Sequence, residues 1–227
     1  MITLAAVDAI KQAQVVAFPA VRDGAESMAA SIAEPWIRPE QRRLPLVFPM
    51  VEAAEPRREA WHQAAAALAA EVECGHAVVL LCEGDASLFA TSSYVVLALQ
   101  QRYPFCPLRV IPGITAISAA AAAGAWPLAL QQDQLLVMPC PDHHEDLIAA
   151  LADAARQERV LALLKLGRRW SWVRPLLEQQ GLLEQTLFAE RVGWADQRVC
   201  RADLLPAGQR PYFSLLLIRQ AWPKVMP

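Results

Sequence analysis

Two apolar segments that each run into a glycine-containing turn constrain the fold of this chain more than any other feature. Residues 78–82 are continuously apolar and are followed by Glu83, Gly84 and Asp85. Residues 109–111 run into Pro112 and Gly113, and the helix-length stretch 92–102 separates the two segments. A continuous apolar run is typical of a strand buried on both faces. Strand, helix and strand in this order predict a βαβ unit, and therefore a parallel sheet.

The turns carry the residue types that a ligand site at a sheet edge needs. Gly84 has no Cβ, so the backbone can turn sharply and approach a ligand closely. Asp85 places a carboxylate just past the strand end, where open α/β sheets bind small molecules. Gly113 likewise forms a glycine turn after an apolar segment, and Thr115, which carries a hydroxyl, follows it. Each turn alone is an ordinary loop signal, but the ordered pair predicts a small-molecule site.

The rest of the chain predicts two α/β domains, residues 1–110 and residues 111–227, with a boundary within residues 107–112. The N-terminal domain holds the parallel sheet. After an Ala-rich helix that Gly124 ends, four further apolar runs predict the strands of a second, mixed sheet. These four runs are residues 135–138, 161–164, 186–189 and 213–218.

Composition excludes several classes of protein. The 227 residues are 55% hydrophobic and carry a formal charge of −2, so we expect a sizeable buried core, no intrinsic disorder and no broad nucleic-acid surface. No apolar run reaches membrane-spanning length, and the first residues carry no basic segment of a signal peptide. Five scattered cysteines indicate reduced thiols, and therefore a cytoplasmic protein.

Other enzyme classes lack their motifs. No Gly-x-Gly-x-x-Gly follows a strand, and no Gly-x-Ser-x-Gly is present, so a nucleotide-dependent oxidoreductase and a serine hydrolase are disfavoured. His143 and His144 precede Glu145 and Asp146. Adjacent residues on a helix point to different faces and the spacing supplies no third ligand, so we expect no metal site there.

Taken in order, these motifs resemble the tetrapyrrole (corrin/porphyrin) methylase family, and the resemblance covers nearly the whole chain. The two glycine turns are similar to the family's loops for S-adenosylmethionine (SAM). Residues 44–50 (LPLVFPM) and 211–215 (PYFSL) are similar to the branch that methylates carbon 20 of precorrin-2. Ala86 departs from the Pro that usually follows the family's Gly-Asp, and residues 89–90 depart from its Tyr-Gly pair.

The resemblance implies a SAM-dependent methyltransferase that acts on precorrin-2 or cobalt-precorrin-2 in cobalamin synthesis, as a homodimer. It implies a SAM site at the domain junction, and no residue is assigned as a catalytic base. The implied cofactor-binding residues are Glu83, Gly84, Asp85, Leu88, Gly113, Thr115, Ala116, Leu166 and Ser214.

Arg42 and Arg43 are the expected partners of the acceptor's carboxylates, because guanidinium groups bind carboxylates through paired hydrogen bonds. The resemblance of residues 211–215 implies that Tyr212 also binds the substrate. The alternative to an active enzyme is a degenerate family member that holds a tetrapyrrole or SAM without catalysis. The family opens with a strand and a Gly-rich loop that this sequence does not show ahead of Ile2, so we expect the chain as given to be weakly active.

Overall fold

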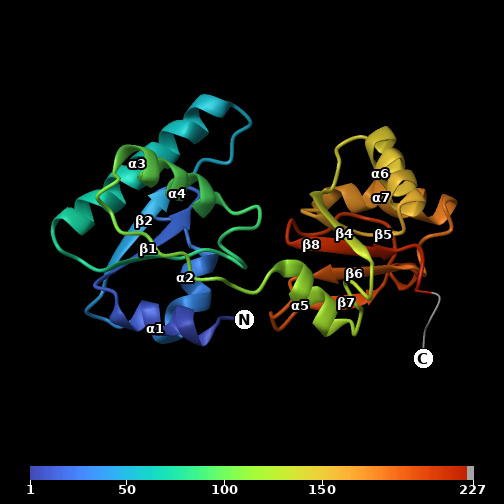
Figure 1. Cartoon of the computed structure of the whole chain (residues 1–227), viewed down its shortest axis with the longest axis horizontal. Coiled ribbons are helices and arrows are strands. Elements are labelled where there is room, and N and C mark those ends of the chain that lie inside the picture. The colour runs from blue at the N-terminus through green and yellow to red at the C-terminus, as the bar shows by residue number, and fades with distance from the viewer. Residues whose placement is uncertain (224–227) are drawn as a thin grey trace. The chain divides into compact units, whose positions relative to one another are not determined.

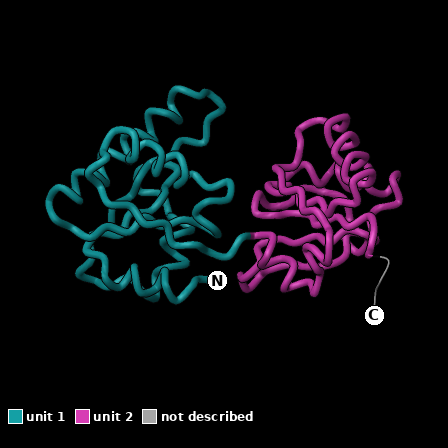
Figure 2. Tube along the Cα trace, in the orientation of Figure 1, with its two compact units in different colours: residues 1–115 teal, residues 116–227 magenta. Residues whose placement is uncertain are grey.

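The computed structural model describes residues 1–223, and the chain divides into two compact units, Met1–Thr115 and Ala116–Pro227 (Figure 2). The sequence places its boundary at residues 110–111, a few residues earlier. Residues 107–115 form no helix or strand, and the second unit starts where a helix begins at Ala116.

The first unit is built on a three-stranded parallel sheet in the order β2-β1-β3. Its strands are β1 (Val15–Ala20), β2 (Arg42–Val47) and β3 (Val78–Leu80). β1 pairs with both neighbours, and Val15 is opposite Arg42 on one side and Val78 on the other. All three strands therefore end at the same edge, and the Gly84 turn follows β3 at that edge.

Helices cover both faces of this sheet (Figure 1). Helices α1 (Leu4–Gln12) and α2 (Met28–Ala33) lie on one face, with a short 3-10 turn, Glu34–Trp36, after α2. Helices α3 (Ala54–Glu73) and α4 (Thr91–Arg102) lie on the other.

Alternation along β1 explains the two cores of this unit. Ala17 packs with residues of α3 and α4, whereas Val16 and Phe18 pack with α1 and α2. Successive side chains of a strand point to opposite faces, so a sheet covered on both faces needs apolar residues at every position. The continuous apolar runs in the sequence have this cause.

The expected strand at residues 109–111 is wrong. Among the described residues, the sheet of the first unit ends at β3, and residues 107–115 run on without pairing as a strand. Val110 and Ile111 are residues typical of a strand, but a strand also needs a neighbour that supplies hydrogen bonds. The parallel sheet itself is confirmed through β1, β2 and β3.

The second unit holds a mixed five-stranded sheet in the order β4-β5-β8-β6-β7. β4 and β5 are parallel, and the other pairs are antiparallel, which confirms the predicted α/β class. The short strand β7 was not predicted. The strands are β4 (Gln134–Pro139), β5 (Arg159–Leu164), β6 (Thr186–Glu190), β7 (Arg198–Arg201) and β8 (Ser214–Arg219).

The main core of the second unit lies between this sheet and helices α6 (His144–Arg156) and α7 (Trp170–Gln179). The Trp170 ring is fully buried, and its centroid lies 5.3 Å from that of Phe188. Its indole N–H donates to the Pro206 carbonyl, so the buried polar atom is satisfied. The remaining helices are α5 (Ala116–Ala123), which contacts β8, and the 3-10 turns Gly167–Arg169 and Ala202–Leu204.

A buried ion pair fixes the end of β8. Arg219 is 1% exposed, and its Nη1 lies 2.6 Å from Asp133 Oδ2. Burial alone would raise the pKa of Asp133, but the Arg219 hydrogen bond and the Leu130 N–H outweigh it, and the net pKa is lowered. The carboxylate therefore stays ionised beside the guanidinium.

We expect Asp133→Asn to lower the free energy of unfolding by about 3 kcal/mol, because it leaves a buried guanidinium without its counter-charge. Since the folded pKa of Asp133 lies below the unfolded value, the contribution is full above about pH 4 and is lost as the pH falls further. Urea denaturation at pH 7 and pH 3 measures both effects. Glu40→Gln, at an exposed pair with Arg38, is the control and should change stability by less than about 0.5 kcal/mol. Equal effects of the two substitutions would contradict this assignment.

Candidate functional site

The turn after β3 adopts a conformation that glycine allows. Gly84 has a φ of 71°, in the left-handed region that residues with a Cβ rarely adopt. The turn places Glu83, Gly84 and Asp85 beyond the carboxyl end of the strand, as the sequence predicts.

The second predicted loop approaches the first more closely than a side chain would permit. A Cβ built on Gly113 would lie 2.1 Å from the Gly84 carbonyl oxygen and 3.1 Å from the Asp85 Cα. Real Cβ atoms do not approach other atoms so closely, so only glycine fits at position 113. The structure thus brings together two turns that are 28 residues apart in the sequence.

The Asp85 carboxylate joins these turns. Its Oδ2 accepts a hydrogen bond from the Gly113 N–H at 2.9 Å. Its Oδ1 accepts from the Ser87 N–H at 2.9 Å and from the Ser87 hydroxyl at 2.5 Å. The Ser87 hydroxyl, the Ser87 N–H and the Gly113 N–H together hold the pKa of Asp85 below its usual value. Both carboxylate oxygens are engaged within the protein, so Asp85 acts here as a clamp between two loops.

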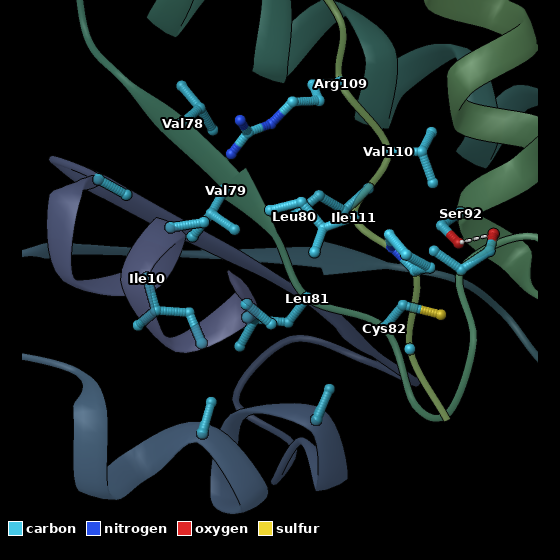
Figure 3. Close-up of a pocket in the computed structure, with 18 of the residues that line it drawn as sticks. Ile10, Val78, Val79, Leu80, Leu81, Cys82, Ser92, Arg109, Val110 and Ile111 are labelled. Carbon is cyan, nitrogen blue, oxygen red and sulfur yellow. Dashed lines mark hydrogen bonds between the residues drawn. The ribbon is translucent and has the colours of Figure 1, made fainter. Parts of the chain in front are cut away.

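A cavity of about 450 Å³ opens beside these turns, within the first unit (Figure 3). Most of its lining is apolar, from β3, α1 and residues 107–114. Polar side chains that line it near Gly84 include Cys82, Glu83 and Ser92. The Ser92 hydroxyl donates to the Ala86 carbonyl at 3.1 Å, and burial raises the pKa of the Cys82 thiol. Ser92 and Cys82 were not predicted as part of this surface, because a serine at a helix start and a cysteine at a strand end carry no ligand signal in the sequence.

Three predicted residues of the second unit also lie together, around the end of β5. The Leu166 N–H donates to the Ser214 carbonyl at 3.0 Å, and the Ser214 hydroxyl accepts from the Gly167 N–H at 3.1 Å. The Cα of Tyr212 lies 3.6 Å from a Cβ built on Gly167. The Leu166 side chain is fully buried in the core of the second unit. Lys165, with a φ of 56°, shapes this turn and was not predicted.

The two predicted arginines lie at the opposite edge of the first unit's sheet from Gly84, because they begin β2 rather than follow it. Arg42 is paired with Glu71, a buried carboxylate that also lies 2.9 Å from His76 Nδ1. The Arg43 guanidinium makes two hydrogen bonds to Glu34, at 2.6 and 2.9 Å. The Glu34 pair raises the pKa of Arg43. Both guanidinium groups thus have carboxylate partners within the protein.

The remaining predicted residues follow the two turns in sequence. Leu88 is half-buried in the loop after Asp85. Thr115 and Ala116 follow the Gly113 turn, and Ala116 begins α5. Across residues 1–223, no group of three or more His, Cys, Asp or Glu side chains could hold a metal ion. None of the helices in that same range is long and apolar enough to cross a membrane.

Comparison with known proteins identifies the family. A family model described as tetrapyrrole (corrin/porphyrin) methylases matches residues 1–205. The chain belongs to this family. The predicted family and the prediction of a methyltransferase are therefore confirmed.

The sequence is similar to named relatives over nearly its full length. It is 31% identical to the cobalt-precorrin-2 C(20)-methyltransferase of Salmonella typhimurium, in an alignment that covers 98% of this chain and 92% of that protein. It is 28% identical to a precorrin-2 C(20)-methyltransferase of a Sinorhizobium species, over 96% and 89% of the two chains.

Among solved structures, the methyltransferase CobJ superposes with a TM-score of 0.65 at 22% identity, over 99% of this chain and 90% of that one. A uroporphyrin-III C-methyl transferase from Thermus thermophilus, complexed with S-adenyl homocysteine, superposes with a TM-score of 0.57 at 20% identity, over 96% and 90% of the chains. These structures show that the two-unit α/β fold is the fold of this family.

We expect Asp85→Ala to lower the free energy of unfolding by only about 1 kcal/mol, because the carboxylate is near the surface. Exchange of the Gly113 amide hydrogen should rise by about tenfold, since its acceptor is lost. Ser87→Ala is the control, because it keeps the bond to Gly113 and should leave that amide protected. NMR measures the exchange rate of the Gly113 amide hydrogen in each variant. Equal exchange of the Gly113 amide in wild type and Asp85→Ala would show that the carboxylate does not clamp the loops.

Proposed function

We propose that this protein transfers the methyl group of SAM to the C(20) meso carbon of precorrin-2 or cobalt-precorrin-2, a step of cobalamin synthesis. The observation that carries the proposal is the joined pair of turns at Gly84 and Gly113 in a chain 31% identical, over nearly its full length, to a cobalt-precorrin-2 C(20)-methyltransferase. Similarity to the Sinorhizobium protein supports the same ring position. The two names differ in whether cobalt is present, so the proposal includes both forms of the substrate.

The residues of the first unit fit a cofactor of this kind. No side chain stands between the Gly84 and Gly113 backbones, so main-chain groups at both turns can approach a ligand closely. Because Asp85 already holds the Gly113 N–H and Ser87, we propose that its role is to keep the turns together. We propose that Glu83, Leu88, Thr115 and Ala116 also contribute to binding of the cofactor.

The chemistry demands alignment more than acid or base groups. SAM would supply a methyl group on a positively charged sulfur that leaves as a neutral thioether, and the meso carbon would lose its proton to solvent as it gains the methyl group. The protein then has to hold the acceptor carbon in line with that bond, which is a proximity effect. A rigid pair of loops suits this task, because a small displacement of either turn would misalign the reacting atoms. We propose that Leu166 and Ser214 act through the backbone of the β5 turn.

The acceptor carries several carboxylates, and we propose that Tyr212, Arg42 and Arg43 contribute to its binding. Tyr212 is about half exposed and stacks edge-on with Phe213. A direct role for Arg42 or Arg43 requires the substrate to replace Glu71 or Glu34 as the partner. We also propose a homodimer, and the exposed Tyr94 and Leu97 on α4 offer apolar surface for it.

A methylation assay tests this proposal. The purified chain is incubated with precorrin-2 and SAM labelled with carbon-13 in the methyl group, and NMR of the product locates the label. We expect the label on the C(20) meso carbon. Binding of SAM or of precorrin-2 without methylation would favour the degenerate alternative, and the absence of binding of either molecule would contradict both.

Gly113→Ala should lower SAM affinity by at least about tenfold in calorimetry, because its Cβ would collide with the Gly84 carbonyl and force the turns apart. Gly124→Ala is the matched control. Its Cβ would lie 2.5 Å from Leu187 Cδ2, the end of a flexible side chain in the second unit. We expect this control to bind SAM as wild type does. Equal affinities of the two variants would count against the Gly84 and Gly113 turns as the SAM site.

A further inference from the structure

Three basic residues lie at one edge of the second unit's sheet. β5 and β6 run in the same direction, because each is antiparallel to β8, which lies between them. Their carboxyl ends therefore share an edge with the starts of β8 and β7. Lys165 directly follows β5, Arg168 lies in the turn after it, and Arg198 begins β7. We call these three residues the basic edge.

The residues of the basic edge lack acidic partners. Lys165 is half-buried, Arg168 and Arg198 are exposed, and none of the three forms an ion pair within residues 1–223. At the other edge of the same sheet, two arginines form ion pairs with aspartates at 2.7 and 2.9 Å: Arg159, which begins β5, and Arg201, which ends β7. The unpaired positive charge of this sheet is therefore concentrated at one edge.

The acidic residues near the basic edge do not neutralise it. Asp142 is paired with Arg169, and Asp196 lies 3.1 Å from Arg191. Glu190 is opposite the first residue of β7 in the ladder, but no ion pair joins the two in the described part of the chain. Three unpaired basic side chains thus outnumber one unpaired carboxylate, and an anion at this edge meets a net positive charge.

The backbone at this edge is held in an uncommon conformation. Lys165 has a φ of 56° and Arg191, which directly follows β6, has a φ of 51°. Residues with a Cβ rarely adopt this left-handed region, and they keep it only where the surrounding structure fixes them. Here the Leu166 N–H donates to the Ser214 carbonyl and the Arg191 N–H donates to the Phe213 carbonyl, both at 3.0 Å. The ends of β5 and β6 are therefore fixed against the start of β8.

The spacing of the basic edge suits a wide ligand with several negative groups. Three strand intervals separate β5 from β7, so the backbones of Lys165 and Arg198 lie roughly 14 Å apart. One carboxylate cannot contact both side chains at once without moving them far from their strands. Between them, Tyr212 and Phe213 precede β8, and each is about half exposed. Aromatic rings bind flat apolar surfaces, and basic side chains bind carboxylates.

We propose that the basic edge binds the peripheral carboxylates of an acidic macrocycle. Lys165 and Arg198 bind carboxylates on two sides of the ring, and Tyr212 lies against the ring between them. Binding here displaces no carboxylate of the protein, whereas Arg42 and Arg43 would have to exchange theirs. The assignment rests on the proposed function, because that function supplies an acceptor with several carboxylates.

Arg198→Gln tests the proposal against a matched control on the same strand. Arg201→Gln removes an arginine from the opposite end of β7. Calorimetry measures the dissociation constant of precorrin-2 without SAM. We expect Arg198→Gln to raise it by at least about fivefold and Arg201→Gln by less than about twofold, because only the first removes a carboxylate partner. Equal dissociation constants of the two variants would overturn the proposal.

Substitutions of Lys165 separate a role in binding from a role in the turn. Lys165→Gln should raise the KM for precorrin-2 by at least about fivefold and leave the KM for SAM unchanged. Lys165→Arg keeps the charge and should restore the KM for precorrin-2. Lys11→Gln, at an exposed position on α1, is the control and should behave as wild type. An equal rise in both KM values, or no recovery in Lys165→Arg, would contradict a direct contact with the acceptor.

These measurements distinguish failure of this assignment from failure of the proposed function. A wild-type chain that binds precorrin-2 without methylating it, and binds it less tightly after Arg198→Gln, would contradict the enzyme and support the basic edge. A chain that methylates C(20) and binds precorrin-2 equally well after Arg198→Gln and Lys165→Gln would support the enzyme and overturn the basic edge. A wild-type chain that does not bind precorrin-2 would overturn the basic edge as well.

Discussion

The hydrogen bond from the Gly113 N–H to the Asp85 carboxylate is the interaction on which the candidate site depends. It joins two turns that belong to different segments of the chain, and the absence of a Cβ at Gly113 lets them meet. The bond is charge-assisted, because Ser87 and Gly113 together stabilise the ionised form of Asp85. A carboxylate used in this way holds the pair of turns in one arrangement.

The parallel sheet explains why the turns are neighbours at all. Strands that run in the same direction end at one edge, so the Gly84 turn after β3 and the segment that returns from α4 reach the same place. Apolar residues at successive positions of β1 hold helices on both faces. Packing on both faces holds the sheet in place, and this packing restricts the motion of the turns that follow its strands.

The sequence was sufficient for the fold class, the two sheets and the meeting of Gly84, Asp85 and Gly113, because each follows from apolar runs and turn residues. It was insufficient for partners that are distant in the chain. The ion pairs of Arg42 with Glu71 and of Arg43 with Glu34 depend on β2 beginning at Arg42, opposite the start of β1. The sequence also does not reveal that Asp85 joins the two turns, because a carboxylate at a strand end can bind a ligand or accept a hydrogen bond from a neighbouring backbone N–H.

Two strand assignments show the same limit. Residues 109–111 have the composition of a strand but no strand beside them within the described part of the chain, and composition alone does not report a neighbour. β7 has only two half-buried residues between arginines, and it forms because β6 offers an antiparallel partner. Pairing, which is a property of the assembled sheet, decided both cases.

Peptide-resolved hydrogen–deuterium exchange with and without SAM tests the central claim, that the two joined turns form the cofactor site. We expect SAM to slow exchange in residues 83–88 and 113–116 of the wild-type protein. We also expect Asp85→Ala to weaken this protection at the same SAM concentration. SAM-dependent protection confined to other segments, with both turns unchanged, would contradict it.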